Sequence, residues 1–156
     1  MKKYLSLFII AVLALALTAC GGKSASEEAA PDDGQNPVMN YVGNYVCGRA
    51  AVLIGATDEK DGASASVKWS SSAAENSTWE MTGTFDPDEK RFEYHDCVKK
   101  ETVYNDDGSI KSEEEVYRGG HGFMFFETGD KLTLTWQEDQ EHVADDMVFT
   151  FDPDMA

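Results

Sequence analysis

Apolar and polar residues alternate along most of the chain beyond residue 37. In the segment 132–136, leucine and tryptophan side chains are separated by single threonines. Phe92 and Tyr94 alternate in the same way with charged neighbours. This period of two residues is typical of a β-strand that buries one face. The pattern predicts strands near residues 40–55, 63–70, 77–85, 90–96, 98–105, 110–118, 121–127, 131–136 and 147–152.

Turn-forming residues separate these predicted strands. Asp61-Gly62 and Asp107-Gly108 are typical of hairpin turns. Strands joined by short turns pair antiparallel, and a meander of about eight or nine strands tends to close because closure removes its exposed edges. We therefore predict an all-β fold, an antiparallel meander that closes into a small up-and-down barrel of calycin-like outline. A two-sheet β-sandwich is the alternative.

The first twenty residues have the organisation of a secretory signal peptide. Lys2 and Lys3 form a positive start, and an apolar run follows over residues 5–17. The run ends in Leu17, Thr18, Ala19 and Cys20. These four residues resemble the lipobox of bacterial lipoproteins. The resemblance implies cleavage between Ala19 and Cys20 and a diacylglycerol on the Cys20 thiol. A transmembrane anchor and an ordinary signal peptide are the alternatives, because the apolar run is about long enough to span a bilayer.

Residues 20–36 differ in composition from the chain that follows. They are rich in glycine, serine, alanine and acidic residues, and they contain no aromatic residue. Such a segment cannot bury enough apolar surface to fold, so we expect a flexible acidic tether. The predicted organisation is a signal peptide over 1–19, a lipid-anchored tether over 20–36 and a single β-barrel domain over 37–154. Lipidation would hold this domain at the cell membrane, facing outside the cytoplasm.

The charge of the chain narrows the classes of partner. Lys and Arg number 13 against 29 Asp and Glu, which gives a net charge of −16. Removal of residues 1–19 would take away two lysines and no acidic residue, so the mature chain would carry −18. This balance argues against nucleic acid, whose phosphates are held by Lys and Arg. It permits a small ligand, a basic protein partner or divalent cations, and solubility alone is the alternative explanation.

Two cysteines remain if Cys20 carries lipid. Cys47 and Cys97 would both lie outside the cytoplasm, where two thiols most often pair, so we predict a disulfide bond between them. Two reduced buried thiols are the first alternative. The second is a metal site that uses Cys97 with His95, although zinc sites usually show closely spaced ligand pairs that this chain lacks.

No motif in the chain indicates catalysis. His121 is flanked by glycines, but neither a nucleophile elbow nor a zinc-protease helix motif accompanies it. The acidic segment 137–146 lacks the ligand order of an EF-hand, and 105–108 is more typical of a hairpin tip than of a calcium loop. We therefore predict no catalytic residue, no metal site and no cofactor.

Two further groups of residues have ordinary structural explanations. Glu113, Glu114 and Glu115 would protect a strand edge from unwanted pairing. Trp69, Trp79 and Trp136 could stack on a ligand, but three tryptophans in a small barrel belong more often to its core.

Cys47 ends the segment Tyr45-Val46-Cys47. Together with the lipobox and the small β domain, this segment loosely resembles the membrane-bound lysozyme inhibitors. That family's late Ser-Gly-rich inhibitory segment has no counterpart here, and Cys97 lies in the middle of the domain. The resemblance implies inhibition of a basic hydrolase, which the acidic charge would suit. Our main expectation is a non-enzymatic module that binds a small ligand or a basic protein, with the lysozyme-type inhibitor as the alternative.

Overall fold

The computed structural model describes residues 34–138 and 141–155. The predicted signal peptide, the predicted lipidation site Cys20 and most of the predicted tether therefore lie outside the described residues. The described part contains no α-helix, and no helix in it is long and apolar enough to cross a membrane.

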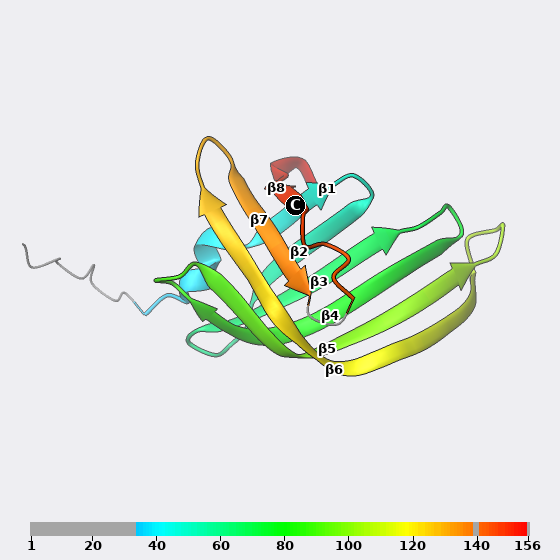
Figure 1. Cartoon of the computed structure of the whole chain (residues 1–156), viewed down its shortest axis with the longest axis horizontal. Helices are drawn as coiled ribbons and strands as arrows, with labels where there is room; N and C mark the ends of the chain where they lie inside the picture. The colour runs from blue at the N-terminus through cyan, green and yellow to red at the C-terminus, as the bar shows by residue number, and fades with distance from the viewer. Residues whose placement is uncertain (1–33, 139–140, 156) are drawn as a thin grey trace, which may run out of the picture. The chain divides into compact units, whose positions relative to one another are not determined.

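Eight antiparallel strands make up the domain (Figure 1). They are β1 (Gly43–Cys47), β2 (Ala50–Ala56), β3 (Gly62–Ser70), β4 (Glu75–Asp86), β5 (Arg91–Tyr104), β6 (Ile110–Thr128), β7 (Leu132–Glu138) and β8 (Val148–Phe151). The 3-10 helices η1 (Pro37–Tyr41) and η2 (Pro153–Met155) flank them. Each strand pairs with the next along the chain, and β8 pairs back with β1, so the sheet closes on itself. The prediction of an all-β antiparallel meander is confirmed.

The division of the chain into strands differs from the predicted one at three places. The predicted strand 40–55 is two strands, because Gly48 adopts a φ of 59° and starts a two-residue turn between Cys47 and Ala50. The predicted strands 90–96 and 98–105 are the single strand β5. The predicted strands 110–118 and 121–127 are likewise the single strand β6. β-Bulges explain both mergers, since an extra residue interrupts the alternation without ending the strand.

The interior of the closed sheet is filled by packed side chains. The indole N–H of Trp136 donates a hydrogen bond to the Tyr94 hydroxyl at 3.0 Å. The Trp136 ring also meets the Trp79 ring edge to face, with centroids 5.4 Å apart. The largest fully buried side chains are Trp136, Tyr45, Tyr94, Phe92, Phe149, Ile54, Met124, Leu134, Val38, Val52 and Val67. The core prediction for Trp79 and Trp136 is confirmed, and Trp69 is partly buried against this core.

The chain enters this domain through η1. The Asn36 side chain accepts a hydrogen bond from the Val38 backbone N–H at 3.0 Å and so caps the helix. The Asn36 amide also donates to the carbonyls of Glu59 and Gly62 in the β2–β3 turn. The end of the predicted tether is therefore attached to the domain at Asn36.

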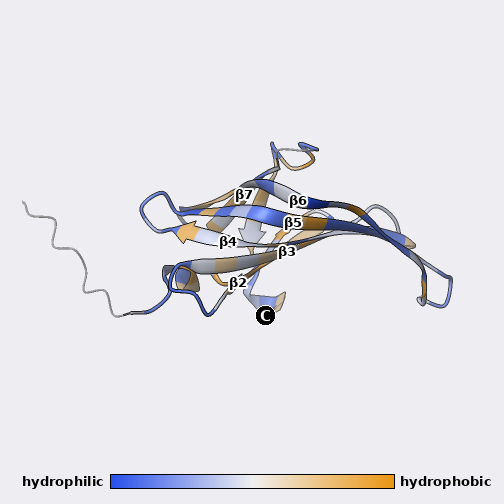
Figure 2. Ribbon diagram, turned by 90° about the horizontal axis from the view of Figure 1, so that it is seen from below, coloured by the Kyte–Doolittle hydropathy of each residue, from blue (hydrophilic) through white to orange (hydrophobic). Residues whose placement is uncertain are grey.

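Strand β6 is longer than its neighbour β7. It spans Ile110–Thr128, but β7 pairs only with residues from Gly122 onward. The earlier part of β6 extends with β5 beyond β7 (Figure 1). We call residues 98–118, which include the β5–β6 turn, the β5–β6 extension. Figure 2 shows hydrophilic residues along much of these two strands.

The buried Tyr45 hydroxyl makes the folding stability of the protein fall at alkaline pH. It is fully buried and donates to the Tyr41 carbonyl at 2.7 Å. Burial, and then the neighbouring Tyr41, hold the pKa of Tyr45 well above its usual value. The stabilisation that comes from this raised pKa is complete below about pH 10, the pKa of the tyrosine in the unfolded chain. It falls as the pH rises further, because Tyr45 then ionises in the unfolded chain but not in the native one.

We expect the urea denaturation midpoint of the wild type to fall as the pH rises above about 10, the ordinary pKa of tyrosine. Tyr45→Phe should cost about 1 kcal/mol at pH 7 through the lost hydrogen bond. The difference in unfolding free energy between variant and wild type should then narrow as the pH rises. The same difference at pH 7 and at alkaline pH would contradict a Tyr45 that is buried in the native state and ionises in the unfolded state.

Candidate binding face

Strands β3 to β6 carry a row of polar side chains on the face opposite the core. Trp79 points into the core, so its neighbour Thr78 points outward. Lys68 lies opposite Thr78, Thr78 opposite Lys100, and Lys100 opposite Glu115. A second row runs parallel to the first through Ser70, Asn76, Thr102 and Glu113. We call these two rows, with Tyr104 and Arg118 at their borders, the outer polar face.

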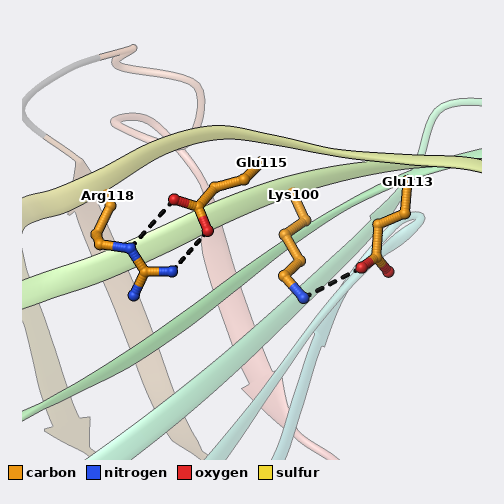
Figure 3. A network of polar contacts seen from close by, with 4 residues as sticks. All are labelled: Lys100, Glu113, Glu115 and Arg118. Carbon is orange, nitrogen blue, oxygen red and sulfur yellow. Dashed lines mark hydrogen bonds and ion pairs between the residues drawn. The ribbon is translucent and has the colours of Figure 1, made fainter.

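Two ion pairs order the charges on this face (Figure 3). The Lys100 ammonium lies 3.1 Å from a Glu113 carboxylate oxygen. The Arg118 guanidinium binds Glu115 through two nitrogens, at 3.1 and 2.6 Å. These contacts with Glu115 raise the pKa of Arg118 above its usual value. Because both pairs are exposed, they contribute little to stability, and their main effect is to fix the order of charges.

A pocket lies at the far end of the outer polar face, beside the β3–β4 and β5–β6 turns. Its volume is about 580 Å³. The backbone N–H of Tyr104 donates to the Ala74 carbonyl at 2.8 Å, which joins the end of β5 to the β3–β4 turn. The residues around the pocket are Lys68, Ser70, Ser72, Ala73, Ala74, Glu75, Asn76, Tyr104, Asn105, Asp106 and Gly108. We call it the Asn76 pocket.

Asn76 has a hydrogen-bonding group that the protein leaves unused. Its side chain is 7% exposed, and its amide nitrogen donates to the Tyr104 hydroxyl at 2.9 Å. Its Oδ1 is buried and has no hydrogen-bond partner among the described residues. Turning the amide over would pair Oδ1 with Tyr104 and leave the nitrogen unpaired instead. Either orientation leaves one buried polar group unsatisfied, which costs about 1–3 kcal/mol.

The β5–β6 turn that borders the pocket is held by its own side chains. The Asp107 carboxylate accepts hydrogen bonds from the Ser109 hydroxyl at 2.6 Å and from the Ser109 backbone N–H at 2.9 Å. Both lower the pKa of Asp107. The Asn105 amide donates to the same hydroxyl at 2.9 Å. The prediction that 105–108 forms a hairpin tip is confirmed, and the turn gives the pocket a defined wall.

A second polar cluster lies around Lys99 of β5, on the face of the sheet that carries Trp79. The Lys99 ammonium is 2.5 Å from a Glu141 carboxylate oxygen and 3.4 Å from Glu101. It also lies over the Trp79 ring, 5.0 Å from the ring centroid. A pocket of about 340 Å³ adjoins it, lined in part by Trp69. Because Lys99 is only 6% exposed and has two carboxylate partners, its charge is already matched within the protein. We therefore regard the Asn76 pocket as the stronger candidate site.

The residues considered for a metal site do not converge. His95 and Asp96 are exposed, whereas Cys97 is buried in the core. The Asp96 carboxylate binds the Thr82 backbone N–H at 3.0 Å and the Thr82 hydroxyl at 2.8 Å, which braces the bulge between β4 and β5. Within residues 34–138 and 141–155, no three His, Cys, Asp or Glu side chains are grouped as metal ligands.

The two domain cysteines lie on strands that do not pair with each other. Cys47 ends β1 and is half-buried, and Cys97 is fully buried in β5. Cys47 is an unbridged thiol in this structure. The predicted disulfide bond between Cys47 and Cys97 stays a prediction.

The remaining sequence candidates occupy exposed positions. His121 is an exposed residue of β6. In the acidic segment 137–146, Glu141 binds Lys99, and His142 pairs with Asp145 at 2.8 Å. Sequence reasoning missed Asn76 and Lys99. A usable signal for Asn76 was its position in a strand, where asparagine is depleted.

Comparisons with known proteins add no relative. The chain matches no protein-family model, no curated protein and no solved structure.

Proposed function

We propose that the protein is a non-enzymatic binding module, held at the outer side of the cell membrane by a lipid on Cys20, that binds through its outer polar face. The observation that carries the proposal is Asn76, a nearly buried amide with an unused hydrogen-bonding group beside a pocket of about 580 Å³. Pockets of about 300–1,000 Å³ are typical of small-molecule sites. The packed aromatic core supports a site on the surface of the sheet instead of inside it.

The anchoring part of the proposal rests on the lipobox-like residues 17–20. The acidic segment 20–36 would then separate the lipid from the domain. A flexible segment of that length has a root-mean-square span of roughly 20–25 Å. Such a tether would let the domain rotate, so that the outer polar face could meet ligands from any direction.

The test is intact mass, measured natively and after denaturation, on the protein purified from the membranes of its own host. We expect a bound mass in the native spectrum that disappears on denaturation. The denaturing spectrum should also show the lipid on Cys20, and a bridge between Cys47 and Cys97 would lower the mass by two hydrogens. A bare native mass would contradict ligand binding through the outer polar face.

Inhibition of a basic hydrolase such as lysozyme is the second candidate function. The observation that favours it is the β5–β6 extension, where the consecutive residues Glu113, Glu114 and Glu115 lie on an exposed stretch of β6. A basic enzyme would be attracted to such a surface, and the attraction would weaken with salt. Unchanged lysozyme activity at micromolar protein would rule this candidate out.

A further inference from the structure

The Asn76 pocket offers hydrogen-bond donors and acceptors at close quarters. The Asn76 amide supplies both kinds of group, and the Tyr104 hydroxyl beside it does the same. The hydroxyls of Ser70 and Ser72 line the same pocket. A ligand group that donates and accepts at once would satisfy the unpaired Asn76 atom in either orientation of the amide. Hydroxyl groups have this property, whereas ammonium and guanidinium groups only donate.

The charges around the pocket have both signs, so neither a cation nor an anion is matched by all of them. Lys68 contributes a positive charge, and Glu75 and Asp106 contribute negative ones. A cationic ligand would meet Lys68, and an anionic ligand would meet the two carboxylates. Ala73, Ala74 and the ring of Tyr104 add apolar surface to the same lining. The lining therefore matches a molecule that is uncharged, rich in hydroxyls and apolar on part of its surface.

We infer that the Asn76 pocket binds a neutral saccharide, an inference that rests on the proposed binding function and names its ligand class. Sugar hydroxyls would pair with Asn76 and with the Ser70 and Ser72 hydroxyls, and Asp106 would accept from a further hydroxyl. Because Asn76 Oδ1 is fully buried in this structure, a sugar hydroxyl reaches it only when the side chains around it shift.

The inference predicts that binding and stability separate at one residue. Asn76→Leu replaces the amide with an apolar group of similar shape and removes the unsatisfied atom. Removal of the unsatisfied atom is stabilising, but the same change also loses the hydrogen bond to Tyr104, so the two effects oppose each other. We expect Asn76→Leu to change the melting temperature little and to weaken saccharide binding by about tenfold or more. A purely structural Asn76 would leave binding unchanged.

The experiment uses the full lipoprotein in a zwitterionic detergent without a sugar headgroup, so that the detergent does not compete. Maltotriose and triacetylchitotriose are titrated by calorimetry, and the two probes separate a plain glucan from an N-acetylated one. Tyr104→Phe is a second variant, and we expect it to weaken binding because it removes the hydroxyl beside Asn76. Gln137→Ala is the matched control, since it removes an exposed amide on β7 outside the pocket.

Binding of either probe that Asn76→Leu abolishes and Gln137→Ala preserves would support the inference. Equal binding by Asn76→Leu and the wild type would overturn it. Failure of the wild type to bind either probe would also overturn it. In that case a different bound mass in the native spectrum would leave the proposed binding function standing, and a bare mass would remove both.

Discussion

Replacing Gly83 by alanine is expected to lower the free energy of unfolding by about 3 kcal/mol or more. Gly83 lies at the bulge where the register between β4 and β5 shifts, opposite Tyr94. A methyl group at this position would overlap the Glu93 carbonyl oxygen and would lie 2.8 Å from the Tyr94 Cα. Both are backbone atoms, so no side-chain rotation relieves the overlap. Urea denaturation followed by tryptophan fluorescence measures the loss, because Trp79 and Trp136 lie in the core.

Gly129→Ala is the matched control for this prediction. The nearest atom to a methyl group at Gly129 is the Lys131 carbonyl oxygen at 3.9 Å, an ordinary contact distance. We expect this variant to unfold within about 0.5 kcal/mol of the wild type, as most surface changes do. Equal stability of the Gly83 and Gly129 variants would mean that the bulge can open to accept a side chain, contrary to the close backbone contact.

Replacing Cys20 by serine is expected to abolish lipid attachment completely. A hydroxyl does not substitute for the thiol that the lipobox resemblance makes the site of modification. Labelled palmitate fed to the host should enter the wild type and be absent from Cys20→Ser. Stable anchoring depends on acyl chains, which contribute about 0.8 kcal/mol for each buried CH₂. A protein that lacks these acyl chains has no lipid attachment to the bilayer.

Cys47→Ser is the control for the lipidation experiment. Cys47 is a half-buried residue at the end of β1, and it should not affect labelling. Intact mass of the mature wild type adds a second readout, because a chain cleaved as predicted begins at Cys20. Palmitate incorporation into Cys20→Ser, or a mature chain that begins elsewhere, would contradict the lipoprotein prediction.

The strands could be predicted wherever their side chains alternate without interruption. The segment around Leu134 and Trp136 is an example, since successive side chains there lie on opposite faces of the sheet in a regular period of two. The predictions were wrong where a bulge adds a residue, as between Tyr94 and Cys97 in β5. A bulge is stabilised by the neighbouring strand, so the sequence of one strand does not reveal it.

The candidate site could not be predicted, because its members come from distant parts of the chain. Asn76 and Tyr104 are 28 residues apart, and Lys99 and Glu141 are 42 apart. Only the pairing of β4 with β5 places the first two side chains on one face. The ion pair between Lys99 and Glu141 similarly depends on a tertiary contact between β5 and the segment after β7.

The sequence by itself determined the class of the fold, the acidic surface and the lipidation prediction. Each of these depends on local patterns: a period of two residues, a ratio of charges and a run of adjacent residues. The tertiary structure decided that β8 closes the sheet against β1, that the aromatic side chains fill its interior, and that Asn76 is left with an unsatisfied atom. These features depend on strand register and on contacts between distant residues, and neither is encoded in any single segment.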